Sequence, residues 1–307
     1  MSNKFKDLYK KSIENPEIFW QEASKDIFWF KEPTKILNKS NAPFYKWFED
    51  GVTNTCYNAL DIHIDQGNGK RTALIYDSPI TGNKSKFTYE ELKIKVSRFA
   101  GALENQGVKK GDRVIIYMPM IPEAVIAMLA CARIGAIHSV VFGGFASNEL
   151  ASRIDDSKAK ILVTASCGFE PGRTVEYKPL VDEAIKQAKH KIDKMILFQR
   201  PGHEVKLSPP VEVSWDEVVE SAQAADCVEM NSNDFAYILY TSGTTGTPKG
   251  IVRDIGGHIV ALKWTMKNIY NIETDDIWWS ASDIGWIVGH SYIVYAPLFK
   301  GCTTVLF

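Results

Sequence analysis

The chain has 307 residues, of which 45% are hydrophobic and 24% charged, and its formal net charge is −1. This composition is ordinary for a globular protein with a large core, and the near-neutral charge excludes a global basic field that would attract nucleic acid. No apolar run is long enough to cross a bilayer, and the acidic residues near the start argue against an organelle transit peptide. We therefore expect a cytoplasmic location and no membrane partner.

The five cysteines are scattered, odd in number and never spaced as Cys-x-x-Cys. This pattern favours small buried residues in a reducing compartment over a disulfide framework. The six histidines show no metal-ligand spacing, and a lone carboxylate such as Asp283 is thin support for a Mg²⁺ site. We predict no metal held by protein ligands.

Residues 1–60 are dense in aromatic side chains, without a clear period. We expect an arm with short helical turns whose rings lie against the main body. The alternative is an exposed patch that binds a partner, which is the rarer origin of such a stretch.

Between residues 73 and 198, short apolar strands alternate with amphipathic helices. Segments 73–76 and 85–87 are expected to pair as a hairpin, and Thr88 with Glu91 forms a capping box that opens a helix ending near Gly107. Further strands are expected at 113–118, 137–141, 161–164 and 195–198, with helices at 122–135, 148–155 and 179–188. This alternation predicts an α/β fold of parallel sheets covered by helices.

The remaining elements follow a proline-bearing loop at 201–210. A buried strand is expected at 235–239, an extended segment at 251–252, a helix at 257–268, a strand at 277–280, a helical or extended stretch at 291–299 and a strand at 302–307. The chain stops inside this last strand on apolar residues. Natural domains rarely end in that way, so we expect part of a longer protein.

The stretch 241–250 carries the clearest chemistry, because it holds five hydroxyl residues, three glycines and one lysine between apolar segments. Glycines let backbone N–H groups approach an anion, hydroxyls add donors and Lys249 adds a charge, which together suit a polyphosphate. A polar surface turn is the commoner origin of such clusters. A P-loop is rejected because Pro248 separates glycine from lysine, no hydroxyl follows the lysine, and the next residues favour a strand.

These residues resemble the phosphate-binding signature of the adenylate-forming enzymes. The aromatic arm and the stretch 278–292 narrow the resemblance to the short-chain acyl-CoA synthetases, the acetyl- and propionyl-CoA synthetases, nearest to the propionate branch. The resemblance implies that residues 1–60 are their N-terminal extension. It also implies that residues 61–307 are an incomplete AMP-binding large domain, with the small C-terminal domain absent.

The resemblance implies two reaction steps, in which a carboxylate attacks the α-phosphate of MgATP and the thiol of CoA then displaces AMP. ATP, CoA and the ATP-borne Mg²⁺ would be the substrates, with propionate or acetate as the acid. The phosphate-binding residues implied are Thr241, Ser242, Gly243, Thr244, Thr245, Gly246 and Lys249. No residue here is assigned as catalytic, and we expect these 307 residues alone not to turn over, because the family's adenine pocket and C-terminal lysine are missing from them.

The acyl pocket implied by the resemblance is lined by Trp286, Ile287 and Val288. In acetate enzymes the residue matching Val288 is commonly threonine, and valine makes the slot more apolar, which suits propionate. For Trp278 and Trp279 a place in the core and a place in the pocket stay equally open. His290 is interpreted as a hydrogen-bonded structural residue and not as a base.

The glycine pair Gly143–Gly144 would by itself indicate a tight turn, and the resemblance places it beside the pantetheine arm of CoA. Arg173 matches a phosphate-contacting arginine of the CoA site, with a solvated surface charge as the alternative. Glu170 stands where acetate enzymes tend to carry another arginine, and an acid there would repel the CoA phosphate.

Three other functions stay open from the sequence. One is a fatty-acid or aryl-acid ligase of the same superfamily, disfavoured by the aromatic arm. Another is a non-catalytic module that binds CoA or a nucleotide. The third is a protein-interaction scaffold built on a decayed enzyme, which the intact stretch with Lys249 argues against. The sequence does not predict an oligomeric state.

Overall fold

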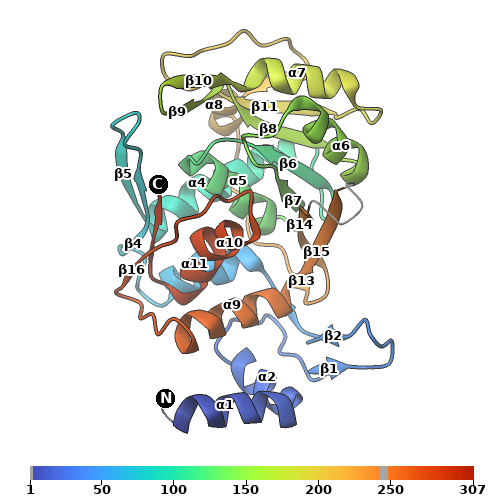
Figure 1. Ribbon diagram of the computed structural model, residues 1–307, viewed down its shortest axis with the longest axis vertical. Coiled ribbons are helices and arrows are strands. Elements are labelled where there is room, and N and C mark those ends of the chain that lie inside the picture. Colours follow the sequence, from blue (N-terminus) through green and yellow to red (C-terminus); the bar gives the residue numbers. More distant parts are fainter. Residues whose placement is uncertain (1–2, 242–247) are drawn as a thin grey trace.

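The computed structural model describes residues 3–241 and 248–307, and its centre is a seven-stranded sheet (Figure 1). In spatial order its strands are β12 (Glu212–Ser214), β11 (Lys194–Phe198), β8 (Ile161–Ala165), β6 (Arg113–Tyr117), β7 (Ile137–Val140), β14 (Phe235–Thr241) and β15 (Lys249–Asp254). All neighbours are parallel except β14 and β15, which form an antiparallel hairpin. The predicted α/β fold of parallel strands and covering helices is confirmed.

Alternation along the central strands divides the core between the two faces of this sheet. Val114 and Ile116 face one hydrophobic cluster, and Ile115 faces the other, because successive side chains of a strand point to opposite faces. The first face is covered by α4 (Tyr89–Asn105) and α5 (Pro122–Arg133), and the second by α6 (Ser147–Ser157) and α7 (Tyr177–Gln187).

The helix boundaries follow local chemistry. The capping box is confirmed: the Thr88 hydroxyl accepts from the Glu91 N–H at 3.2 Å, and the Glu91 carboxylate accepts from the Thr88 N–H at 2.8 Å. Both bonds satisfy N–H groups that the first turn leaves without partners. The helix ends before Gly107, whose φ of 86° few residues other than glycine adopt.

A second sheet of four strands packs beside the first (Figure 1). Its order is β16 (Ile277–Trp279), β17 (Thr303–Leu306), β4 (Thr72–Asp77) and β5 (Lys84–Thr88). The predicted hairpin is β4–β5, and β17 joins it to β16 in parallel register. Between β16 and β17 the chain forms α10 (Ile287–Gly289), the π-helical segment η2 (His290–Tyr295) and α11 (Ala296–Lys300).

The N-terminal arm is more regular than expected. It begins with α1 (Asn3–Glu14) and α2 (Pro16–Ser24), followed by the short pairs β1 (Leu37–Asn38) with β2 (Lys46–Trp47) and β3 (Val52–Thr53) with β13 (Met230–Asn231). The expected packing of its rings holds for Phe19 and Trp20, which lie 5.3 Å and 5.9 Å from the ring of Trp264 on α9 (Gly256–Asn268). Phe44 is 74% exposed, so the packing does not extend to the whole arm.

The remaining elements are η1 (Tyr57–Asp61), α3 (Ile62–Asp65), β9 (Cys167–Glu170), β10 (Arg173–Glu176) and α8 (Trp215–Glu220). Among the described residues, no helix combines the length and apolar character that crossing a bilayer requires.

Candidate active site

The glycine- and hydroxyl-rich stretch joins two strands at the edge of the seven-stranded sheet. Thr241 ends β14 and stands opposite Lys249, the first residue of β15, in the antiparallel register. Lys249 is exposed and lies on a strand, which agrees with the rejection of a helix-opening P-loop. The predicted phosphate ligands Ser242, Gly243, Thr244, Thr245 and Gly246 lie outside the described residues.

The end of β14 is fixed to α6 by one aromatic ring. The Tyr240 hydroxyl donates to Asp156 at 2.7 Å, and the guanidinium of Arg153 lies 5.3 Å from the centre of the Tyr240 ring. The same guanidinium lies 4.8 Å from the ring of Phe145 and forms an ion pair of 2.8 Å with Glu149. Arg153 is buried, so these contacts connect the hairpin of β14 and β15, called here the signature hairpin, to the turn that precedes α6.

That turn contains the predicted glycine pair. The Tyr117 hydroxyl lies 3.2 Å from the carbonyl oxygen of Gly143 and 2.7 Å from that of Phe145. A side chain at Gly143 would overlap the hydroxyl of Tyr177, so glycine is required here by a close approach. Sequence reasoning left open whether the pair marks a tight turn or a ligand site, and the structure supplies a packing reason for at least one of the two glycines.

The predicted acyl-pocket stretch lies against the same turn. The ring of Trp286 lies 5.5 Å from that of Phe142 and 6.1 Å from that of Phe145. Trp286 is nevertheless 49% exposed. The structure thus brings together the glycine turn and Trp286, which are more than 140 positions apart in the chain.

Ile287 and Val288 point elsewhere, toward an open cavity of about 400 Å³. Apolar and polar side chains of the arm, β14, β15, α9 and η2 complete its wall. The lining residues are Trp47, Tyr237, Arg253, Asp254, Gly257, His258, Ala261, Leu262, Ile287, Val288, Ser291 and Tyr292. Trp286 is not among them, so the three predicted acyl-pocket residues divide between two neighbouring places.

The two remaining tryptophans of this stretch differ. Trp278 is partly buried, packs against the core and donates its indole N–H to the carbonyl of Tyr292 at 2.6 Å. Trp279 is 57% exposed and touches the ring of Phe307. The core alternative for Trp279 is therefore wrong.

Sequence reasoning did not find the polar wall of the cavity. His258 is buried, and neither ring nitrogen has a hydrogen-bond partner among the described residues. Burial lowers the pKa of His258 to about 3 and raises that of Asp254. His258 lies on a helix, 21 positions from Tyr237, the nearest tyrosine of the wall in sequence. No sequence period relates the two residues, so the sequence did not single out His258.

His290 is structural, as interpreted from the sequence. Its Nδ1 lies 3.2 Å from the carbonyl oxygen of Ile284, its Nε2 lies 3.2 Å from Nε2 of His138, and the side chain is fully buried. Burial lowers the pKa of His290 to about 3, so the imidazole is neutral and closed to substrate. Asp283 is likewise occupied, because its Oδ1 accepts from the N–H of Gly285 at 2.7 Å and burial raises its pKa.

Arg173 and Glu170 face each other across the hairpin of β9 and β10, which sequence reasoning did not predict. Both Nε and Nη2 of Arg173 lie 2.7 Å from one carboxylate oxygen of Glu170. The arginine side chain is 70% exposed. The acid expected to repel a phosphate is thus bound to the arginine expected to hold it.

The fold and these stretches define a class of protein, and sequence comparison agrees with it. The family model described as "AMP-binding enzyme" matches residues 63–307, and the model described as "Acetyl-coenzyme A synthetase N-terminus" matches residues 5–59. The chain belongs to the AMP-binding enzyme family.

Individual relatives agree with the resemblance to short-chain acyl-CoA synthetases. "Acyl-CoA synthetase short-chain family member 3, mitochondrial" from Homo sapiens is 54% identical over 306 residues, covering 99% of this chain and 45% of the relative. The protein of the same name from Mus musculus is 52% identical over 304 residues, covering 99% and 45%. "Acetyl-coenzyme A synthetase" from Xanthobacter autotrophicus is 44% identical over 309 residues, covering 99% and 47%. The chain spans about half the length of the curated relatives it matches.

Proposed function

We propose that this chain is the N-terminal part of a short-chain acyl-CoA synthetase, which joins a small carboxylate to CoA through an acyl-adenylate. The observation that carries the proposal is a convergence: the signature hairpin, the glycine turn and the Trp286 stretch are connected through Arg153, Phe145 and Phe142. Residues 1–60 would form the N-terminal extension and residues 61–307 the incomplete AMP-binding domain.

The first step breaks the bond between the α- and β-phosphates of ATP. A carboxylate oxygen attacks the α-phosphorus, and pyrophosphate leaves with the electron pair of the broken bond. Thr241 and Lys249 would hold the β- and γ-phosphates together with Ser242, Gly243, Thr244, Thr245 and Gly246. Their contribution is electrostatic, because hydroxyl, amide and ammonium groups offset the charge that the leaving pyrophosphate gains.

Mg²⁺ would enter as part of MgATP. Two carboxylates of the stretches that carry the site already accept hydrogen bonds: Asp156 from the Tyr240 hydroxyl and Asp283 from the Gly285 N–H. Neither is offered as a ligand, and the ion would be held by the phosphates and by residues beyond this chain.

In the second step the sulfur of CoA attacks the acyl carbon and AMP leaves. The pantetheine arm would pass over Gly143 and Gly144 beside the ring of Trp286. Arg173 would reach the nucleotide phosphates only after parting from Glu170, to which it is bound in the free chain.

The acid would be propionate, with acetate as the second choice. Ile287 and Val288 offer aliphatic surface to the cavity, and burying one more methylene there is worth about 0.8 kcal/mol. The preference is therefore expected to be modest. We propose a cytoplasmic location, although the relatives from human and mouse carry the word mitochondrial in their own names.

The test is ATP–pyrophosphate exchange, measured with acetate, propionate and butyrate. A protein that contains this chain and extends to the length of the relatives should exchange fastest with propionate, and exchange should require the acid. The 307 residues alone should exchange at background rate. Binding of ATP or CoA without any exchange in the longer protein would favour the non-catalytic alternative. Fastest exchange with a longer or aromatic acid would favour another ligase of the superfamily.

A further inference from the structure

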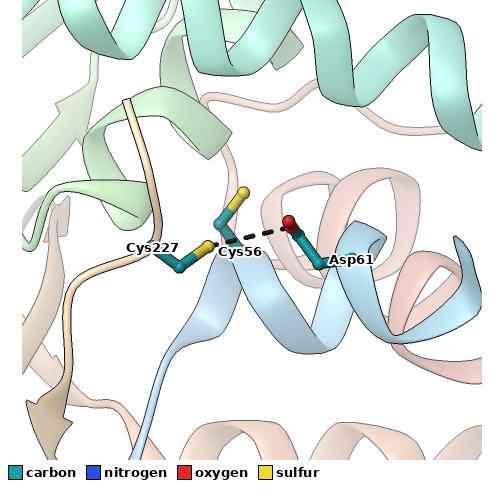
Figure 2. A group of neighbouring side chains, drawn as sticks. All are labelled: Cys56, Asp61 and Cys227. Atoms are coloured by element: carbon teal, nitrogen blue, oxygen red, sulfur yellow. Dashed lines mark hydrogen bonds between the residues drawn. The ribbon is translucent and has the colours of Figure 1, made fainter. Parts of the chain in front are cut away.

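Two cysteines from distant parts of the chain meet under the surface, away from the candidate active site (Figure 2). Cys56 is fully buried and stands directly before η1, whereas Cys227 is partly exposed and lies between α8 and β13. Their sulfur atoms and a carboxylate oxygen of Asp61 all lie within 4.8 Å of one another. In Figure 2 the Cys227 sulfur points toward Cys56 and is joined by a dashed line to the Asp61 carboxylate, whereas the Cys56 sulfur is turned to one side of that line.

The positive charges around this group oppose a metal ion. Arg133 donates to both carboxylate oxygens of Asp61, at 2.7 Å and 3.1 Å, and Lys93 lies 3.3 Å from the same carboxylate. A divalent cation would have to displace these contacts and would then lie beside a buried guanidinium. Asp61 is therefore already paired with Arg133 and Lys93 and is a poor metal ligand. The two thiols are then better considered as partners in a reaction with each other.

The two thiols lie beside groups of opposite charge. Arg133 Nη1 lies 3.6 Å from the Cys56 sulfur, and the Cys227 thiol donates to Asp61 at 3.7 Å. A guanidinium beside a sulfur stabilises the negative charge that this sulfur carries when it attacks. We propose that Cys56 and Cys227 are a redox pair that hydrogen peroxide converts to a reversible disulfide.

The reaction balances in two steps. Peroxide reaches the partly exposed Cys227 and gives a sulfenic acid and one water. The Cys56 sulfur then attacks the sulfenic sulfur and expels hydroxide, which leaves as a second water with the Cys56 proton. Two thiols are oxidised to one disulfide, one peroxide is reduced to two waters, and a dithiol reductant restores the thiols by exchange.

The main chain at Cys227 is already held in place for such a bond. Arg133 Nε donates to the Ala225 carbonyl at 2.7 Å, and the Val228 N–H donates to the Arg133 carbonyl at 3.0 Å. From the other side, the Asn54 amide donates to the Val228 carbonyl at 2.9 Å. The two sulfurs, which lie within 4.8 Å of each other, would therefore reach the about 2.05 Å of a disulfide by movement of the side chains about a fixed main chain.

Hydrogen bonding with Cys56 and burial raise the pKa of the Cys227 thiol. Little thiolate is present at neutral pH, so oxidation is expected to be slow there and faster as the pH rises.

The test treats the chain with peroxide, quenches it and counts thiols after unfolding. The count should fall from five to three, and mass spectrometry of a digest should find a Cys56 peptide joined to a Cys227 peptide. Both changes should reverse with dithiothreitol. In Cys227→Ser the count should stay at four, because Cys56 is buried and has lost its partner. The matched control Cys131→Ser removes a fully buried thiol from elsewhere, and it should still lose two thiols.

Peptide mapping of the unmodified chain keeps the test independent of how the variants fold. The proposal is overturned if the mapped bond joins other cysteines. It is equally overturned if sulfonic acid accumulates at Cys227 without a crosslink, or if zinc binds with both thiols protected.

Discussion

The imidazoles of His138 and His290 lie face to face in the interior, with Nε2 atoms 3.2 Å apart and ring planes 17° from parallel. The Tyr295 hydroxyl reaches the same nitrogen of His138 at 3.0 Å, and the ring of His258 packs edge-on against Tyr295. Burial lowers the pKa of His258 and His290 to about 3 and that of His138 well below its usual value. The folded chain thus keeps these three imidazoles neutral, and burial also lowers the pKa of a fourth histidine, His63, to about 4.

Acid sensitivity follows from these depressed pKa values. Above about pH 6.5 the histidines are neutral in both folded and unfolded chains and do not make stability depend on pH. As the pH falls below that value, the unfolded chain takes up protons that the folded chain refuses. Each histidine then lowers the free energy of unfolding by up to about 1.4 kcal/mol per pH unit. Urea unfolding between about pH 7.5 and 5 measures this slope.

The variant His258→Phe isolates one of the three histidines. It keeps a ring of similar size among Tyr237, Tyr295 and Phe299 and removes the two nitrogens that lack partners in the described chain. The dependence of the free energy of unfolding on pH should become weaker by the contribution of one histidine, up to about 1.4 kcal/mol per pH unit. The control Ser40→Ala changes an exposed, uncharged side chain and should leave the slope unchanged, and equal slopes in all three proteins would contradict the assignment.

Gly143→Ala should disturb the turn through a single contact. The new methyl group would overlap the Tyr177 hydroxyl, and relief by movement should cost about 1–3 kcal/mol, as overpacking does elsewhere. Adding Tyr177→Phe removes the overlapping oxygen and should restore part of that stability. Thermal unfolding of the single and double variants measures the rescue, and a double variant no better than Gly143→Ala would show that the contact is not the cause.

Glu170→Gln should strengthen CoA binding in a protein of full family length. Neutralising the acid frees Arg173, and because the pair is exposed, the expected gain is below about 1 kcal/mol, a two- to five-fold lower KM for CoA. The gain should shrink in high salt. Arg173→Gln in the same background should abolish it. If the KM for CoA does not change in Glu170→Gln, Arg173 is a solvated surface charge and not a ligand of the CoA phosphates.

Val288→Thr should move the choice of acid toward acetate. A hydroxyl in the wall makes the cavity less apolar, so the ratio of kcat/KM for propionate to that for acetate should fall by up to about four-fold, which corresponds to the about 0.8 kcal/mol that one buried methylene is worth. Val211→Thr, on an exposed loop, serves as the control. An unchanged ratio would place Val288 outside the acyl pocket.

Lys249→Ala should slow adenylation in the same long protein. Loss of one charge from the phosphate site should reduce ATP–pyrophosphate exchange about 100-fold or more, as removal of other preorganised groups does. Lys186→Ala, on the exposed face of α7, should exchange normally. Normal exchange by the Lys249 variant would show that the signature hairpin does not bind the ATP phosphates during adenylation.

Local signals predicted most of the fold. The capping box at Thr88, the hairpin at β4–β5 and the alternation of strands and helices from 113 to 198 depend on neighbours in sequence, and each is confirmed. The hairpin β9–β10 was missed because its residues toward the tip are polar and largely exposed, so no apolar period marks it. The pairing of β9 with β10 follows from the tight turn between them and not from the kinds of residue in the strands.

The site was predictable only in part, because its contacts are long-range. Trp286 was singled out from the sequence as part of the acyl-pocket stretch, which stays a prediction, and its packing on Phe142 joins residues that no local pattern relates. The histidine pair is separated by 152 positions, and the partners of a buried imidazole cannot be identified without the fold. For Trp279 the sequence left a place in the core and a place in the pocket equally open, and the residue lies exposed on an edge strand.

The place of β17 has a consequence for synthesis on the ribosome. This strand is hydrogen-bonded to β16 on one side and to β4 on the other, with Thr304 opposite Leu74. The β4–β5 hairpin emerges early, yet the edge that β17 will cover stays open until the more than 200 residues that separate β5 from β17 have been translated. Nascent chains should therefore display a vacant backbone edge while those residues are synthesised, and factors that shield unpaired strands would act on it there.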